Sequence, residues 1–167
     1  MDAGMSSVAT IEQSLMVDLA GGQQLHVKRL TNDPDAPAVL LLHGLLEDGT
    51  IFYSGKGRGL APYLAHNGFD AFVPDLRGKG RSWPPVRGWA SYRVGDAINQ
   101  DIPAVLSRIQ ELKGELPRFW VNHAWGGVLA SSFLARYPRY RGSLNGLVNF
   151  GVHRVAVQRS LSRLIWL

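Results

Sequence analysis

The chain has 167 residues, of which 46% are hydrophobic and 19% charged, a composition that supports one packed domain, or part of a larger one, and excludes wholesale disorder. It contains no cysteine, which excludes a disulfide framework, thiolate zinc sites and cysteine nucleophiles. The formal net charge of +5 is spread unevenly, because residues 1–115 carry all 13 acidic side chains and residues 116–167 carry seven arginines and no acid.

The basic C-terminal part of the chain has two explanations. Either the arginines serve an anionic partner such as nucleic acid or a membrane surface, or the acidic remainder of a larger domain is missing. We favour the second, because the arginines are scattered over predicted helix, loop and strand and match no nucleic-acid-binding module. There is no targeting signal and no apolar run near the ~18 residues of a membrane span. The sequence therefore predicts a soluble, cytoplasmic protein without a membrane span.

The first predicted element is an antiparallel hairpin. Residues 14–19 and 24–30 form two extended runs, and Gly21 and Gly22 between them are typical of a hairpin turn. Residues 31–37 follow as a loop that is rich in Asp, Asn and Pro.

Four apolar runs then alternate with helical patterns. Continuous apolar runs of this kind are typical of strands that are buried on both faces of a parallel sheet. The predicted strands cover residues 38–42, 69–73, 118–121 and 144–150. The predicted helices cover residues 59–66, 96–113 and 125–137, and the second has a kink or a late start near Asp101 and Pro103. Strands that alternate with helices indicate crossover connections, so we expect an α/β fold with a mainly parallel sheet and an N-terminal antiparallel hairpin.

Two glycine-containing motifs follow the first two of these strands, at the edge where open α/β sheets bind ligands. The first is LHGLL at residues 42–46, in which Gly44 permits a backbone amide to face a pocket. The second is DLRGKGRS at residues 75–82, which has the composition of a phosphate loop. Its spacing excludes one, because the lysine is followed by Gly80 rather than Ser or Thr and the required upstream glycine is absent.

The third motif, VNHAWGG at residues 121–127, lies where a predicted strand meets a predicted helix. Small residues at its fourth, sixth and seventh positions permit a sharp bend, which forces the apex residue outward over the edge of the sheet. A nucleophile elbow places its serine at this apex, and the next amide then serves the oxyanion hole. In this chain the apex is Ala124.

The three motifs, VLLLHG, FVPDLRGKGRS and VNHAWGG, in this order and spacing resemble the α/β-hydrolase superfamily, in particular its serine esterases and lipases. The resemblance covers about residues 14–150 of the chain. It implies that Ala124 stands at the nucleophile position and that the amides of Leu45 and Trp125 form the oxyanion hole.

The resemblance also implies supporting residues in the loop and the elbow. These are His43, Gly44, His123, Gly126 and Gly127. We expect the first histidine to brace its loop and the second to pack under the elbow, rather than to take part in chemistry. The five histidines of the chain have no paired spacing and join no carboxylate cluster, so we expect no metal and no cofactor.

The sequence departs from the family pattern at three points. Asn122 replaces the usual first glycine of the elbow, and Ala124 replaces the serine. Residues 125–167 contain no Asp or Glu, and their only histidine is His153, so a triad cannot be completed from them. The epoxide hydrolase and haloalkane dehalogenase branches use Asp as the nucleophile and are excluded equally, because a methyl group has no lone pair with which to attack.

We therefore expect an incomplete α/β-hydrolase domain over residues 1–167, with its C-terminal strands missing and the start of a cap or lid at residues 152–167. The sequence predicts a serine ester-hydrolase lineage that is inactive as this chain. Two alternatives stay open: a non-catalytic relative that binds a ligand or a protein, and a truncated fragment without a function of its own. The expected partners are a small-molecule ester or other acyl compound and, through the exposed strand at residues 144–150, a second copy of the chain, but not nucleic acid.

Overall fold

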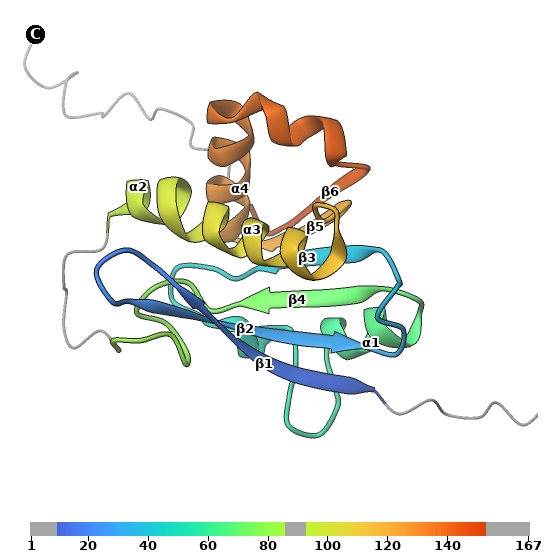
Figure 1. The fold of residues 1–167 in the computed structure, drawn as a ribbon. Coiled ribbons are helices and arrows are strands. Elements are labelled where there is room, and N and C mark those ends of the chain that lie inside the picture. Colours follow the sequence, from blue (N-terminus) through green and yellow to red (C-terminus); the bar gives the residue numbers. More distant parts are fainter. Residues whose placement is uncertain (1–9, 86–92, 153–167) are drawn as a thin grey trace, which may run out of the picture.

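A computed structural model describes residues 10–85 and 93–152 of the chain. Its centre is a sheet of six strands in the order β1-β2-β4-β3-β5-β6 (Figure 1). The strands are β1 (Ile11–Asp18), β2 (Gln24–Thr31), β3 (Ala38–Leu42), β4 (Asp70–Pro74), β5 (Phe119–His123) and β6 (Gly146–Phe150). The last four are mutually parallel, whereas β1 and β2 are antiparallel to their neighbours. This arrangement confirms the predicted α/β fold with a mainly parallel sheet and an N-terminal hairpin.

The N-terminal hairpin turns at two glycines. Gly21 and Gly22 have φ of 86° and 78°, in the left-handed region that glycine adopts without steric cost. The Leu19 amide donates a hydrogen bond to the Gln23 carbonyl at 2.7 Å and so closes the turn. The register then pairs every residue of β1 with one of β2.

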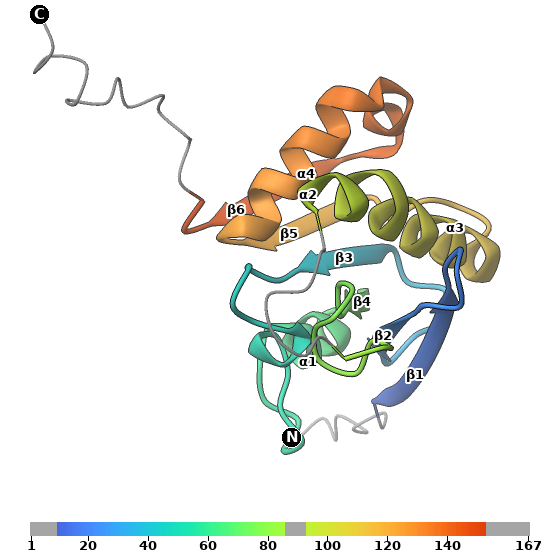
Figure 2. The same ribbon diagram turned by 90° about the vertical axis from the view of Figure 1, so that its left-hand side faces the viewer.

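The helices cover both faces of the sheet. They are α1 (Leu60–His66), α2 (Val94–Asp96), α3 (Ile102–Lys113) and α4 (Trp125–Arg136), and short helical turns are η1 (Gly49–Ile51), η2 (Ala97–Asp101) and η3 (Pro138–Ser143). Figure 2 shows α3 and α4 on one side of the sheet and α1 on the other. Within the described ranges, no helix combines the length and the apolar character needed to cross a membrane.

Strand β3 shows why its sequence is a continuous apolar run. Leu40 and Leu42 belong to the hydrophobic cluster that α3 and α4 cover, whereas Val39 and Leu41 belong to the cluster on the α1 side. All five residues of the strand are buried. Because successive side chains of a strand point to opposite faces, a strand between two helical layers needs apolar residues at every position.

The predicted long helix over residues 96–113 is interrupted near its start. Residues Ala97–Asp101 form a π-helical turn before α3 begins at Ile102. Asp101 is completely buried in this turn and accepts a hydrogen bond from Arg77 Nε at 2.7 Å. The structure thus starts α3 at Ile102, within the stretch where the sequence predicts a kink or a late start, and places a π-helical turn before it.

Strand β6 forms one edge of the sheet, beside β5. Its residues Leu147, Val148 and Phe150 are 37%, 46% and 51% exposed. Of the cap or lid expected at residues 152–167, only Val152 lies within the described residues, and His153 lies outside them.

Candidate active site

The junction between β5 and α4 has an unusual backbone conformation at Ala124. Its φ of 45° and ψ of −115° make it the one residue other than glycine with a positive φ in the described part of the chain. Such a conformation costs about 1–3 kcal/mol and persists only where the surroundings enforce it. Here the Ala124 amide donates to the Phe150 carbonyl at 2.8 Å, and its carbonyl accepts from the Gly127 amide at 3.1 Å. The predicted sharp bend between strand and helix is present.

Glycines allow the start of α4 to approach its neighbours closely. A methyl group on Gly126 would lie 2.4 Å from the Leu42 carbonyl oxygen, and one on Gly127 would lie 2.2 Å from Val152 Cγ2. Both distances are shorter than any real contact of a Cβ atom, so a side chain at either position would push the helix away. The two glycines therefore set the elbow against the end of β3 and the segment that follows β6.

The loop after β3 lies beside the apex of the elbow. A methyl group on Gly44 would lie 3.4 Å from Ala124 Cβ. Leu45, the next residue, is 56% exposed, and Trp125 opens α4, where amides have no acceptor within the helix. Neither of these two amides donates a hydrogen bond to another residue of the described ranges. The structure therefore brings Gly44, Ala124 and the start of α4 together at the carboxyl edge of β3 and β5.

His43 is buried beneath this loop in a neutral form. The Leu76 amide donates to His43 Nε2 at 3.1 Å, and His43 Nδ1 lies 2.8 Å from the Gly44 carbonyl oxygen. Because a backbone amide can only donate, Nε2 carries no proton and Nδ1 donates to the carbonyl. Burial lowers the pKa of the imidazole, which keeps it neutral. With these contacts the ring joins the loop after β3 to the loop after β4.

Glu47, to which the sequence assigns no role, joins the loop to the elbow. Its Oε2 accepts a hydrogen bond from the Gly44 amide at 3.0 Å and lies 2.7 Å from His123 Nδ1. Burial alone would raise the pKa of the Glu47 carboxyl, but the hydrogen bonds from His123 and Gly44 outweigh it and lower the pKa. His123 is expected under the elbow, yet its side chain is 38% exposed and faces this carboxylate.

Asn122, which stands where the family has glycine, links β5 to the edge strand. Its Nδ2 donates to Asn149 Oδ1 at 2.9 Å, in agreement with the pairing of these two residues in the parallel ladder. Asn122 is completely buried, and its Oδ1 accepts no hydrogen bond from the described residues. Where the family pattern has a small glycine, this chain therefore has a side chain that makes a polar contact between two strands.

The motif DLRGKGRS is built around the carboxylate of Asp75. Its Oδ1 accepts from the Gly49 amide at 2.7 Å, and its Oδ2 accepts from the Arg81 amide at 3.0 Å. A methyl group on Gly80 would lie 2.3 Å from Asp75 Cγ, so the glycine makes room for a side chain of the protein. The motif has a structural explanation that needs no phosphate.

A shallow hollow of about 370 Å³ lies between the loops that follow β3 and β4. It is lined by Leu46, Glu47, Asp48, Thr50, Ile51, Gly78, Lys79 and Gly80. Through Glu47 it borders the pair with His123, so it adjoins the elbow without including the apex. Among the described residues, no three His, Asp or Glu side chains gather in a geometry that could hold a metal ion.

Comparison with known proteins gives matches to hydrolases over most of this chain. The family model described as serine aminopeptidase, S33, matches residues 33–154. Epoxide hydrolase 2 of Siraitia grosvenorii is 32% identical over 132 residues, which cover 79% of this chain and 36% of the relative. Epoxide hydrolase 3 of the same organism is 36% identical over 118 residues, which cover 68% of this chain and 33% of the relative. The chain thus spans about a third of the length of these curated relatives.

Solved structures share the fold at low identity. A thioesterase domain from the curacin biosynthetic pathway has a TM-score of 0.62 and 24% identity, over 93% of this chain and 52% of its own. A predicted CIB-like hydrolase from Thermoplasma acidophilum has a TM-score of 0.63 and 15% identity, over 90% of this chain and 67% of its own. The motifs, the fold and the match over most of the chain lead to one conclusion: the chain belongs to the serine aminopeptidase S33 family, within the α/β-hydrolase superfamily.

Proposed function

We propose that this chain binds the carbonyl group of a small ester or related acyl compound at its elbow and forms no covalent intermediate there. The observation that supports the proposal is the strained backbone of Ala124, whose φ of 45° occurs at a sharp turn from strand to helix, as in a nucleophile elbow. A methyl group has no lone pair, so acyl transfer through residue 124 has no route.

The amides of Leu45 and Trp125 supply the binding part of the proposal. Backbone N–H groups do not depend on the side chain at residue 124, and a pair of them suits a carbonyl oxygen that carries negative charge. The start of α4 adds its dipole, whose positive end faces the same place. The proposed site is therefore an oxyanion hole without its nucleophile.

The ester class is favoured over the epoxide class. The curated relatives include epoxide hydrolases and a carboxymethylenebutenolidase homolog of Mus musculus, and the solved neighbours include esterases. An epoxide has no carbonyl oxygen for two amides to hold, whereas an ester or thioester has one. The chain contains no acidic side chain after Glu115, so we propose no hydrolytic triad for the elbow within this sequence.

The placement of residue 124 is tested by Ala124→Cys. The chain has no cysteine, so the variant carries a single thiol at the apex. We expect it to be acylated by p-nitrophenyl butyrate about tenfold faster than the thiol of Ser54→Cys, because the start of a helix lowers the pKa of a thiol. Ser54 is exposed in a loop and is the matched control. Equal rates for the two thiols would contradict an outward-facing apex.

Binding itself is tested with N-(4-nitrophenyl)butanamide, an amide analogue of the ester, by NMR titration of the wild-type chain. Shifts of the Leu45 and Trp125 amide resonances support the proposal. The absence of any shift on titration, or shifts confined to other residues, would contradict it and favour a chain without ligand-binding function at the elbow.

We also propose that a second copy of the chain pairs with strand β6. The strand GLVNF has no charged residue, and its apolar side chains are exposed on both faces. A two-fold antiparallel pairing centred on Val148 would place Phe150 of one copy across from Gly146 of the other. A large aromatic side chain opposite a glycine fills the space that the glycine leaves, so the strand is complementary to itself.

A further inference from the structure

Three polar side chains form a chain of hydrogen bonds on the hairpin side of the sheet. Ser14 Oγ lies 3.1 Å from His26 Nε2, and His26 Nδ1 lies 2.9 Å from Asp75 Oδ2. Both distances lie in the range that joins a nucleophile to its base and the base to the group that orients it.

The fold explains why these residues meet. In the hairpin, Ser14 pairs with Lys28 and Met16 pairs with His26, so Ser14 and His26 occupy diagonal positions on one face. Strand β4 pairs with the other side of β2, and the Asp75 amide, just past its end, donates to the His26 carbonyl at 2.8 Å. The set lies on β1, β2 and the loop after β4, whereas the elbow follows β5, farther along the sheet.

Asp75 fixes the direction of its own hydrogen bond with His26. Burial alone would raise the pKa of this carboxyl, but hydrogen bonds from His26 and from the Arg81 and Gly49 amides lower it. An ionised carboxylate only accepts, so His26 Nδ1 carries the proton, and the role of general base assigns Nε2 as the acceptor of Ser14 Oγ–H. Arg81 Nη1 donates to Ser14 Oγ at 3.2 Å, which leaves the hydroxyl proton for the histidine.

The solvent exposure of the three side chains also fits a nucleophile with a buried base and a buried carboxylate behind it. His26 and Asp75 are 0% and 1% exposed, whereas Ser14 is exposed on β1. Only the serine can therefore meet a reagent from solution, while the base and its orienting carboxylate stay shielded. The guanidinium of Arg81, also exposed, lies beside the serine oxygen as a positive charge.

We propose that Ser14 is an activated nucleophile, with His26 as its general base, Asp75 as the orienting carboxylate and Arg81 as the group that stabilises the developing negative charge. With an activated ester, Ser14 Oγ bonds to the acyl carbon as its proton passes to His26 Nε2, and the carbonyl electrons move to an oxygen beside Arg81. The tetrahedral adduct collapses with loss of the alkoxide, which takes the proton from His26. The products are acyl-Ser14 and the free alcohol.

The test is covalent labelling of the intact wild-type chain with diisopropyl fluorophosphate. Attack by Ser14 Oγ forms the O–P bond, fluoride leaves, and the serine proton passes through His26 to solvent. We expect one diisopropylphosphoryl group, located on Ser14 by peptide mass spectrometry. Ser14→Ala should abolish the adduct, whereas Ser54→Ala, which removes an exposed serine bonded to the Arg58 amide and not to an imidazole, should leave it unchanged.

The supporting residues are tested by rate. Arg81→Gln alters an exposed side chain and should slow labelling by about tenfold or more, through loss of charge stabilisation. His26→Gln should slow it by about 100-fold, the typical contribution of a general base. Because His26 is buried and the variant risks misfolding, the wild-type rate is also compared in H2O and D2O, and a slower rate in D2O reports proton transfer in the attack.

Three outcomes would overturn the proposal: labelling of Ser14 no faster than that of Ser54, equal rates in H2O and D2O, or full labelling of a folded His26→Gln variant. A purely structural network between β1, β2 and the loop after β4 predicts all three. The result is independent of the elbow, because any adduct is assigned to a residue, and Ala124 cannot form one.

Discussion

Ala124 holds a backbone conformation that residues with a side chain rarely adopt. The strain is local, and two features enforce it: the hydrogen bond of its amide to the Phe150 carbonyl, and the close packing of Gly126 against the Leu42 carbonyl. With serine or aspartate at this position, the strained backbone would point a side-chain oxygen outward. In this chain the strained backbone is present and the reactive atom is not.

This strain predicts an unusual response to glycine. Ala124→Gly should stabilise the fold by about 1 kcal/mol, because relief of the strain exceeds the entropy that glycine adds to the unfolded chain. The same substitution at exposed Ala135, in the last turn of α4, should destabilise by up to about 1 kcal/mol. Urea unfolding of both variants measures the change in the free energy of unfolding. A loss of stability in both would show that Ala124 is unstrained.

At the scale of elements, strand β6 contrasts with the other edge of the sheet. Both edge strands expose large apolar side chains, with Val148 46% exposed on β6 and Met16 44% exposed on β1. Strand β1 also carries Glu12 and Asp18, charges that discourage pairing with another chain, whereas β6 carries none. Self-association should therefore use β6.

Sedimentation velocity tests this difference with two equivalent substitutions. The wild-type chain should self-associate as its concentration rises. Val148→Lys should shift it toward the monomer by placing a charge in the pairing strand, whereas Met16→Lys should leave the association unchanged. A wild-type chain that stays monomeric at high concentration, or equal effects of the two lysines, would contradict the proposed pairing.

The elements also show which structural features the sequence alone is sufficient to predict. Strand β3 has the predicted bounds, because burial on both faces leaves an unbroken apolar run. No local pattern predicts the π-helical turn before α3, and its residue Asp101 contacts Arg77, which lies 24 residues away in the sequence. The contact of Glu47 with His123 spans 76 positions and equally leaves no periodic signal. Motifs predict what one strand end contains, and only the fold shows which loops meet.

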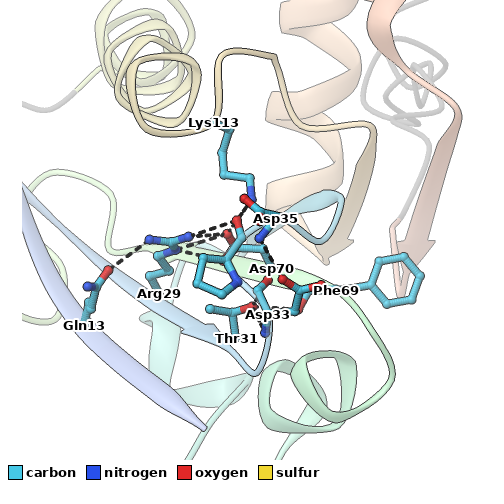
Figure 3. Close-up of polar contacts among 9 residues, drawn as sticks. Gln13, Arg29, Thr31, Asp33, Asp35, Phe69, Asp70 and Lys113 are labelled. Carbon is cyan, nitrogen blue, oxygen red and sulfur yellow. Dashed lines mark hydrogen bonds and ion pairs between the residues drawn. The ribbon is translucent and has the colours of Figure 1, made fainter.

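At the scale of the whole molecule, a buried cluster of charges joins the sheet to α3 at the end opposite the elbow (Figure 3). Asp70, at the start of β4, accepts from Arg29 Nε at 2.9 Å and Nη2 at 2.6 Å, and Lys113 Nζ lies 3.0 Å away. Gln13 on β1 accepts a further bond from Arg29 at 3.1 Å. One buried carboxylate thus connects β2, β4 and the last residue of α3.

The cluster predicts a large loss of stability for Asp70→Asn. The variant leaves two cations facing each other without a counter-charge, which costs about 3–5 kcal/mol when a buried pair loses one partner. Glu111→Gln removes one partner of the exposed pair with Arg108 and should change the free energy of unfolding by about 0.5 kcal/mol or less. Chemical denaturation of both variants measures the difference, and similar small effects would show that the cluster contributes little.

The position of Asp75 has a consequence for any experiment on this protein. One of its oxygens anchors Gly49, whose neighbours line the hollow beside the elbow, and the other holds the imidazole of His26. The two oxygens of this one carboxylate therefore hold two separate regions, the hollow beside the elbow and the network of Ser14 and His26. A substitution there disturbs both at once and cannot assign an effect to either, so each region has to be probed through residues that it does not share.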